Sequence, residues 1–210
     1  MDALLMCGGR GTRLAAGAER GGSGATAPDG AVDDATREKP LVRVSDRPMI
    51  DRVYDALAAS GVDRVHAVVS PHAPETRAHL AAADRRLVDA PGEGYVADLD
   101  HALAAVGRPA LTVAADLPLL APEPVDRTLA AARERDGPVR SLAVHVPAAL
   151  KRALGASVDT TVERDGRELA PAGLNVVADG PDALRVSHDA RLAVNVNRPP
   201  DVELAEALCA

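Results

Sequence analysis

The sequence has almost no aromatic residues. Phe and Trp are absent, and Tyr occurs only at positions 54 and 95. With 47% hydrophobic residues in 210, a sizeable core is still available, but Leu, Val and Ala must fill it. The only cysteines, Cys7 and Cys209, provide neither a disulfide framework nor a metal-ligand spacing. The N-terminal apolar run is too short for a signal peptide or membrane segment, so we expect a cytoplasmic protein.

The sequence also lacks a positive balance of charge. The net charge is −7, which argues against a general nucleic-acid-binding protein, because such proteins need a basic face. A small anionic ligand is not excluded, since local arginines can override a distant acidic surface. Arg outnumbers Lys 22 to 2. An acidic surface with few lysines and many alanines suits a salt-adapted, GC-rich source, and halophilic archaea fit that description.

What is present is a regular alternation of short apolar runs and helical periodicities. This alternation predicts an α/β fold, a Rossmann-like three-layer sandwich whose mainly parallel central sheet has helices on both faces. We expect one domain over residues 1–210, with a flexible insertion at about 15–35 that is rich in Gly, Ala and acidic residues. The predicted strands cover residues 3–7, 65–70, 86–89, 110–115, 141–146, 174–178 and 192–196. The predicted helices cover residues 50–57, 99–106, 125–132 and 202–208.

The first predicted strand runs into the sequence CGGRGTR, residues 7–13. Glycines let the chain turn sharply and let a ligand approach the backbone, and a following helix would favour an anion at its N-terminus. Arg10 and Arg13 add donors suited to phosphate oxygens. The stretch therefore predicts a phosphate cradle, although a tight turn with exposed arginines is the alternative.

Two common phosphate motifs do not fit this loop. No Gly-Lys-Ser/Thr follows for a P-loop, and Leu14 replaces the third glycine of the dinucleotide motif. Lys39, in the sequence REKPL, is a rare lysine in an arginine-rich chain. Its compact charge can follow one phosphate through a reaction, whereas the alternative is a solvated loop lysine.

These motifs give the chain a resemblance to a known family. GGRGTR (8–13) followed by EKPL (38–41) resembles the signature of the nucleotidyltransferase superfamily with the sugar-nucleotide transferase fold. GEGYVADLDHAL (92–103), AADLPLL (114–120), PAGLNVV (171–177) and LAVNVNRPPDVELAE (192–206) are similar to the archaeal GTP:adenosylcobinamide-phosphate guanylyltransferases. The match runs in order along nearly the whole chain. It departs from the family at residues 15–35, where such proteins are usually shorter.

The resemblance implies transfer of GMP from GTP to adenosylcobinamide phosphate, with release of pyrophosphate, in adenosylcobalamin biosynthesis. Both substrates are anionic, so the protein must neutralise charge and hold geometry. The resemblance implies catalytic roles for Lys39 at the α-phosphate, for Arg13 and for Asp116. The expected triphosphate cradle is formed by Gly8, Gly9, Arg10, Gly11, Thr12 and Arg13.

Polar residues at the ends of two predicted strands are the expected ligands of Mg²⁺. Asp116 ends an apolar run, which places a hard oxygen ligand at the carboxyl edge of the sheet; a cap for the turn before Pro118 is the alternative. Asn195 and Asn197 are two residues apart, on one face of a predicted strand. We expect Asn195 to contact the nucleotide and Asn197 the metal, although asparagine also suits a turn before prolines.

The remaining candidates concern the base and the acceptor. The resemblance implies that Gly94 and Tyr95 contact guanine or ribose. Asp98 could accept hydrogen bonds from guanine, which adenine cannot satisfy, or could stabilise a helix start. Gly173 and Asn175 are expected at the acceptor, with a plain turn as the alternative for Gly173.

The expected partners are GTP and adenosylcobinamide phosphate, with no nucleic acid and no membrane span; a homodimer is left open. One alternative function keeps the fold and changes the acceptor to a molybdopterin cofactor or a sugar 1-phosphate. A GTP-binding regulator without chemistry is the alternative from another class, and Lys39 and Asp116 argue against it.

Overall fold

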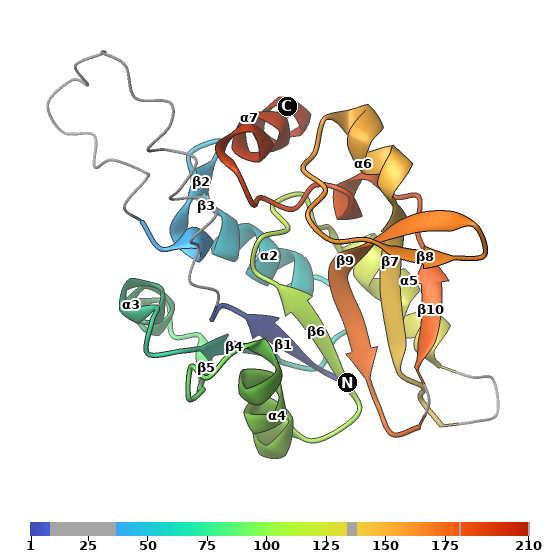
Figure 1. Cartoon of the computed structure of the whole chain (residues 1–210). Coiled ribbons are helices and arrows are strands. Elements are labelled where there is room, and N and C mark those ends of the chain that lie inside the picture. Colours follow the sequence, from blue (N-terminus) through green and yellow to red (C-terminus); the bar gives the residue numbers. More distant parts are fainter. Residues whose placement is uncertain (9–36, 134–137, 181, 210) are drawn as a thin grey trace, which may run out of the picture.

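The computed structural model describes residues 1–8, 37–133, 138–180 and 182–209 (Figure 1). The predicted cradle residues 9–13 and the predicted insertion at 15–35 lie outside these ranges. The described strands are β1 (Asp2–Met6), β2 (Arg43–Val44), β3 (Arg47–Pro48), β4 (Val65–Val69), β5 (Arg86–Asp89), β6 (Ala110–Ala114), β7 (Leu142–Pro147), β8 (Val162–Arg164), β9 (Arg167–Val177) and β10 (Ala183–Val186). The described helices are η2 (Lys39–Leu41), α2 (Met49–Ala58), α3 (Pro74–Ala82), α4 (Tyr95–Val106), α5 (Pro122–Ala132), α6 (Ala148–Leu154), η3 (Ala190–Leu192) and α7 (Pro199–Leu208).

One mixed sheet forms the centre of the fold. Its strand order is β10-β7-β9-β6-β1-β4-β5, and β8 extends it by pairing with β9. β6, β1, β4 and β5 are parallel to one another, as are β10 and β7, whereas β9 is antiparallel to both β6 and β7. The carboxyl ends of β1 and β6 therefore lie side by side at one edge, where open α/β sheets bind ligands.

Helices cover both faces of this sheet because the strands are apolar on both faces (Figure 1). Leu5 of β1 belongs to the larger core cluster, together with Val53 of α2 and Leu129 of α5. Leu4 faces the opposite way and belongs to a second cluster with Leu103 of α4. The three layers confirm the predicted α/β Rossmann-like sandwich.

Most predicted elements are present with small changes at their ends. Residues 174–178 are the end of a much longer strand, β9, and helices α3 and α6 were not predicted. None of the helices within the described ranges is long and apolar enough to span a lipid bilayer.

The predicted strand at residues 192–196 is wrong. The chain forms the short helix η3 and then an irregular segment. β6 already pairs with β1 and β9, so no position beside it is open to another strand. Val194 and Val196 are instead fully buried in a small cluster with Val44 and Met49, and the backbone N–H of Val196 donates to Asp116 O at 2.9 Å. This packing brings residues 193–197 next to the segment that carries Lys39.

Candidate active site

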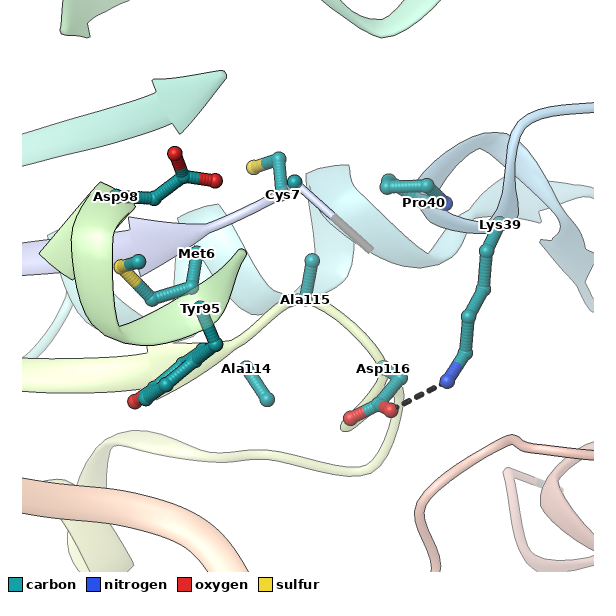
Figure 2. A pocket seen from close by; sticks show the side chains of 10 residues that line it. Met6, Cys7, Lys39, Pro40, Tyr95, Asp98, Ala114, Ala115 and Asp116 are labelled. Carbon is teal, nitrogen blue, oxygen red and sulfur yellow. Dashed lines mark hydrogen bonds and ion pairs between the residues drawn. The ribbon is translucent and has the colours of Figure 1, made fainter. Parts of the chain in front are cut away.

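Lys39 lies at the carboxyl edge of the sheet, between two predicted site residues. Its Nζ donates to Asp116 Oδ2 at 2.6 Å and to Asn197 Oδ1 at 2.7 Å. The side chains of Lys39 and Asp116 are only 16% and 17% exposed, which strengthens their attraction relative to a surface pair. The three residues come from segments far apart in the sequence, and Figure 2 shows Lys39 reaching Asp116. The structure therefore brings together one predicted catalytic lysine and both predicted metal ligands.

Glu38 fixes the start of the segment that carries Lys39. Its two carboxylate oxygens accept the backbone N–H groups of Glu75 at 2.8 Å and Thr76 at 2.7 Å, in the first turn of α3. The N-cap residue of α3, Ala73, has no side chain that could cap these groups. Glu38 thus supplies a helix cap from a distant segment and also complements the helix dipole. Because Lys39 is the next residue in the chain, this contact also fixes the position of its backbone.

A cavity of about 220 Å³ opens beside Lys39 and is called the first cavity below (Figure 2). Its walls are mainly small and apolar, with polar groups at its ends. Five predicted site residues line it: Gly8, Lys39, Tyr95, Asp98 and Asp116. The other lining residues are Met6, Cys7, Pro40, Ala114 and Ala115. Burial raises the pKa of the Cys7 thiol far above its usual range, so this cysteine is a buried apolar group and not a nucleophile.

Asp98 anchors the loop that precedes α4. It is 3% exposed, and its Oδ1 accepts the backbone N–H of Gly92 at 2.8 Å. Its Oδ2 lies close to Gly8, where an added Cβ would come within 2.9 Å, so a larger residue at position 8 would require Asp98 to shift. One carboxylate oxygen of Asp98 therefore binds the loop before α4. This contact is closer to the predicted role at the helix start than to the predicted contact with guanine. The contact with guanine stays a prediction for the other oxygen.

The loop ends at Gly94, which has φ +115°, and α4 begins at Tyr95. Tyr95 is 54% exposed and lines the first cavity. Its ring is therefore available to a ligand, as the predicted contact with base or ribose requires.

A second cavity of about 260 Å³ meets the first at Ala114 and Asp116, which line both. It is called the second cavity below, and seven of its eleven lining residues have polar side chains. The other lining residues are Lys151, Ser157, Asp159, Thr160, Ala170, Pro171, Gly173, Asn195 and Asn197.

The two predicted acceptor residues, both on β9, differ in position. Gly173 lines the second cavity with φ +77°, and an added Cβ would lie 3.1 Å from Ala114 Cβ. Asn175 pairs with Thr112 in the middle of β6 and lines neither cavity. The structure thus places Asn175 away from both cavities, because β9 runs antiparallel to β6 and carries later residues away from the edge, and its acceptor role stays a prediction.

Asn195 and Asn197 contact two different lysines. Asn197 Oδ1 accepts from Lys39, whereas Asn195 Oδ1 accepts from Lys151. They were predicted on one strand face, but no strand exists here. Each amide instead belongs to the irregular segment between η3 and α7 and fixes a separate ammonium group.

Lys151 is the residue that sequence reasoning missed. It lies on α6, is 3% exposed, and donates to Ala193 O at 2.8 Å as well as to Asn195. Burial lowers the pKa of its ammonium group, and the charges of Asp201, Asp116 and Asp159 oppose that shift. The chain has two lysines, and both lie at this site. The scarcity of lysine was the signal that could have found Lys151.

The oxygens of Asp116 and Asn197 fit a magnesium ion that arrives with a nucleotide. Both contact the same ammonium group, so this position already attracts a cation. Within the described ranges, no three His, Cys, Asp or Glu side chains gather closely enough to hold a metal by themselves. Mg²⁺ commonly uses one or two protein oxygens and completes its shell with phosphates and water, so this small donor set is adequate.

Comparisons with known proteins identify the family of the chain. Residues 3–175 match the family described as the MobA-like NTP transferase domain. Among curated proteins, the adenosylcobinamide-phosphate guanylyltransferase of Methanocaldococcus jannaschii is 29% identical over 218 residues. That alignment covers 99% of this chain and 97% of the relative.

Solved structures show the same fold. A nucleotidyl transferase from Methanothermobacter thermautotrophicus matches with a TM-score of 0.63 and 18% identity, covering 99% of this chain and 96% of that chain. A hypothetical transferase from Thermus thermophilus matches with a TM-score of 0.54 and 23% identity over 84% of this chain. The match covers 64% of the Thermus protein. At these identities the likeness concerns the fold alone.

Proposed function

Because the chain belongs to the MobA-like NTP transferase family and is a nucleotidyltransferase, we propose that it transfers GMP from GTP to adenosylcobinamide phosphate. The products would be adenosylcobinamide-GDP and pyrophosphate. The observation that carries the proposal is the contact of Lys39 with Asp116 and Asn197, at the point where two cavities meet. Similarity over 99% of the chain to a curated enzyme of this name supports the choice of substrates.

The reaction joins two anions, so charge is its main obstacle. A phosphate oxygen of the acceptor attacks the α-phosphorus of GTP. The bond from that phosphorus to the oxygen shared with the β-phosphate breaks, and pyrophosphate leaves. Lys39, in the wall of the first cavity and in contact with Asp116, would neutralise charge that grows at the α-phosphate. Residues 9–13 follow Gly8 directly, and we assign them to the β- and γ-phosphates.

Mg²⁺ is the proposed cofactor, held by Asp116 and Asn197 together with phosphate oxygens. When bound, it would supply Lewis-acid stabilisation of the triphosphate. In the structure both of these oxygens accept hydrogen bonds from the ammonium group of Lys39. If Mg²⁺ bound the two oxygens instead, the ammonium group would lose these partners and could donate to a phosphate.

The nucleotide would enter the first cavity from the side of α4. Tyr95 is exposed there and can lie against a base or ribose. Asp98 offers its second oxygen to donors on guanine, a pairing that favours GTP over ATP.

The test is pyrophosphate release by purified protein with Mg²⁺ and KCl, with GTP or ATP and one acceptor at a time. We expect release with GTP and adenosylcobinamide phosphate, and none after chelation of Mg²⁺. Equal rates with GTP and ATP would show that the Asp98 assignment is wrong. Release with a molybdopterin cofactor or a sugar 1-phosphate, but not with the corrinoid, would overturn the proposed acceptor and leave the nucleotidyltransferase chemistry intact.

A further inference from the structure

Lys151 brings a second positive charge to the active site, in addition to that of Lys39. Lys39 lies in the wall of the first cavity and Lys151 in that of the second. The chain uses arginine at 22 positions and lysine at only these two. The two lysines thus line two different cavities that meet at Ala114 and Asp116.

The ammonium group of Lys151 is buried against neutral oxygens. Its acceptors among the described residues are Ala193 O and Asn195 Oδ1, and it forms no ion pair with a described carboxylate. A lysine ammonium has three N–H groups, so one donor is left for a group in the cavity that Lys151 lines. A buried charge without an ionic partner is unfavourable unless a ligand supplies one.

The nearby carboxylates are bound to other groups. Asp201 accepts from the backbone N–H groups of Ser157, Asn197 and Arg198 and from Ser157 Oγ, at 2.8 to 3.0 Å. Asp159 accepts from Arg198 at 2.6 Å. Burial lowers the pKa of Lys151, and the charges of these carboxylates only oppose that effect, so an added anion would relieve it.

We propose that the second cavity holds the phosphate group of the acceptor and that Lys151 is its cationic ligand. This inference rests on the proposed nucleotidyl transfer, because the acceptor oxygen must reach the α-phosphorus beside Asp116. The second cavity borders that point through Ala114 and Asp116. Gly173 and Thr160 also line this cavity, and the Thr160 hydroxyl would add a further donor.

The proposal can be tested on the wild-type protein without the corrinoid. Protein containing ¹⁵N- and ¹³C-labelled lysine gives two side-chain signals, because the chain has two lysines. The signal that disappears in Lys39→Arg belongs to Lys39. With Mg²⁺ and a non-hydrolysable GTP analogue bound, we expect inorganic phosphate to shift the Lys151 signal saturably. Chloride at matched ionic strength should leave it unchanged. A shift of Lys39 alone, or no shift of Lys151, overturns the proposal.

Kinetics give the second test. Lys151→Met should raise KM for adenosylcobinamide phosphate by about 10- to 100-fold, as expected for loss of one charged hydrogen bond, and leave the Kd of GTP within about threefold. Arg152→Gln is the matched control, because Arg152 lies on the same helix and pairs with Glu168 at the surface. Equal weakening of GTP and acceptor would mean that Lys151 is merely structural. If the wild type does not use the corrinoid, the proposed substrate fails, while the labelled-lysine titration still decides the role of Lys151.

Discussion

The two cavities that meet at Asp116 are built differently. The first is lined by small apolar residues and by backbone at the end of β1, with Lys39 as its cation. The second has more polar side chains, from α6, from residues 157–160 and from the segment before α7, and β9 adds small or apolar residues. A nucleoside triphosphate presents repeated phosphate oxygens that backbone groups can bind, whereas a particular acceptor must be distinguished by side chains. The difference suggests that the first cavity serves the shared chemistry and the second the choice of acceptor.

The loops beside the two cavities are nevertheless fixed by the same kind of contact, in which a carboxylate accepts hydrogen bonds from backbone N–H groups. On the first side, Glu38 and Asp98 each use a carboxylate to accept backbone N–H groups, in the first turn of α3 and in the loop before α4. On the second side, Asp201, in the first turn of α7, holds the backbone of Asn197. Each carboxylate ties a site segment to a helix start, where negative charge is stabilised.

The largest effect should come from removing the cation of the first cavity. Lys39→Ala is expected to lower kcat by about 10²- to 10³-fold, as for loss of one preorganised donor to transition-state charge. The Kd of GTP should change little, because the lysine acts most strongly where charge develops. Single-turnover rates and calorimetry separate the two quantities. A rise in KM with kcat unchanged would show that Lys39 only binds the ground state and would weaken the contrast between the cavities.

The next largest effect should be structural and fall on the second cavity. Asp201 is 1% exposed and accepts four hydrogen bonds, so Asp201→Ala leaves buried donors without an acceptor. We expect a loss of about 3 kcal/mol in the free energy of unfolding, measured by urea denaturation. Glu203→Ala is the control, since Glu203 is exposed on the same helix. Equal stability of the two variants would show that Asp201 is not the anchor of this wall.

The two cavities also differ in how far their residues could be predicted from the sequence. The loop and Lys39 lie in short motifs whose chemistry can be interpreted locally, whereas the contact of Lys39 with Asp116 follows only from the fold. Lys151 has no motif, and its partner Asn195 is 44 positions away, so only the fold brings them together. The alternation of polar and apolar residues over positions 194–197 drew attention to Asn195 and Asn197 but wrongly predicted a strand. Buried Val194 and Val196 give the same sequence pattern in a strand and in a packed irregular segment.

The smallest expected effect tests whether the anchor on the first side serves catalysis or only the helix. Glu38→Gln keeps the shape of the side chain but leaves one of two backbone N–H groups without an oxygen acceptor. We expect a loss of about 1 kcal/mol in stability, from a weakened hydrogen bond at a helix start. We also expect kcat to fall by about 3- to 10-fold, on the order of the same 1 kcal/mol, because Lys39 directly follows the anchor.

Glu75→Gln is the matched control for this change. It removes the same charge from the same turn of α3, where Glu75 is exposed, but leaves the Glu38 carboxylate in place. Its kcat should therefore equal that of the wild type. If Glu38→Gln lowers the melting temperature while kcat stays at the wild-type value, Glu38 caps α3 without positioning Lys39. The position of the lysine would then depend on its own contacts with Asp116 and Asn197, and the two cavities would differ in how their cations are held.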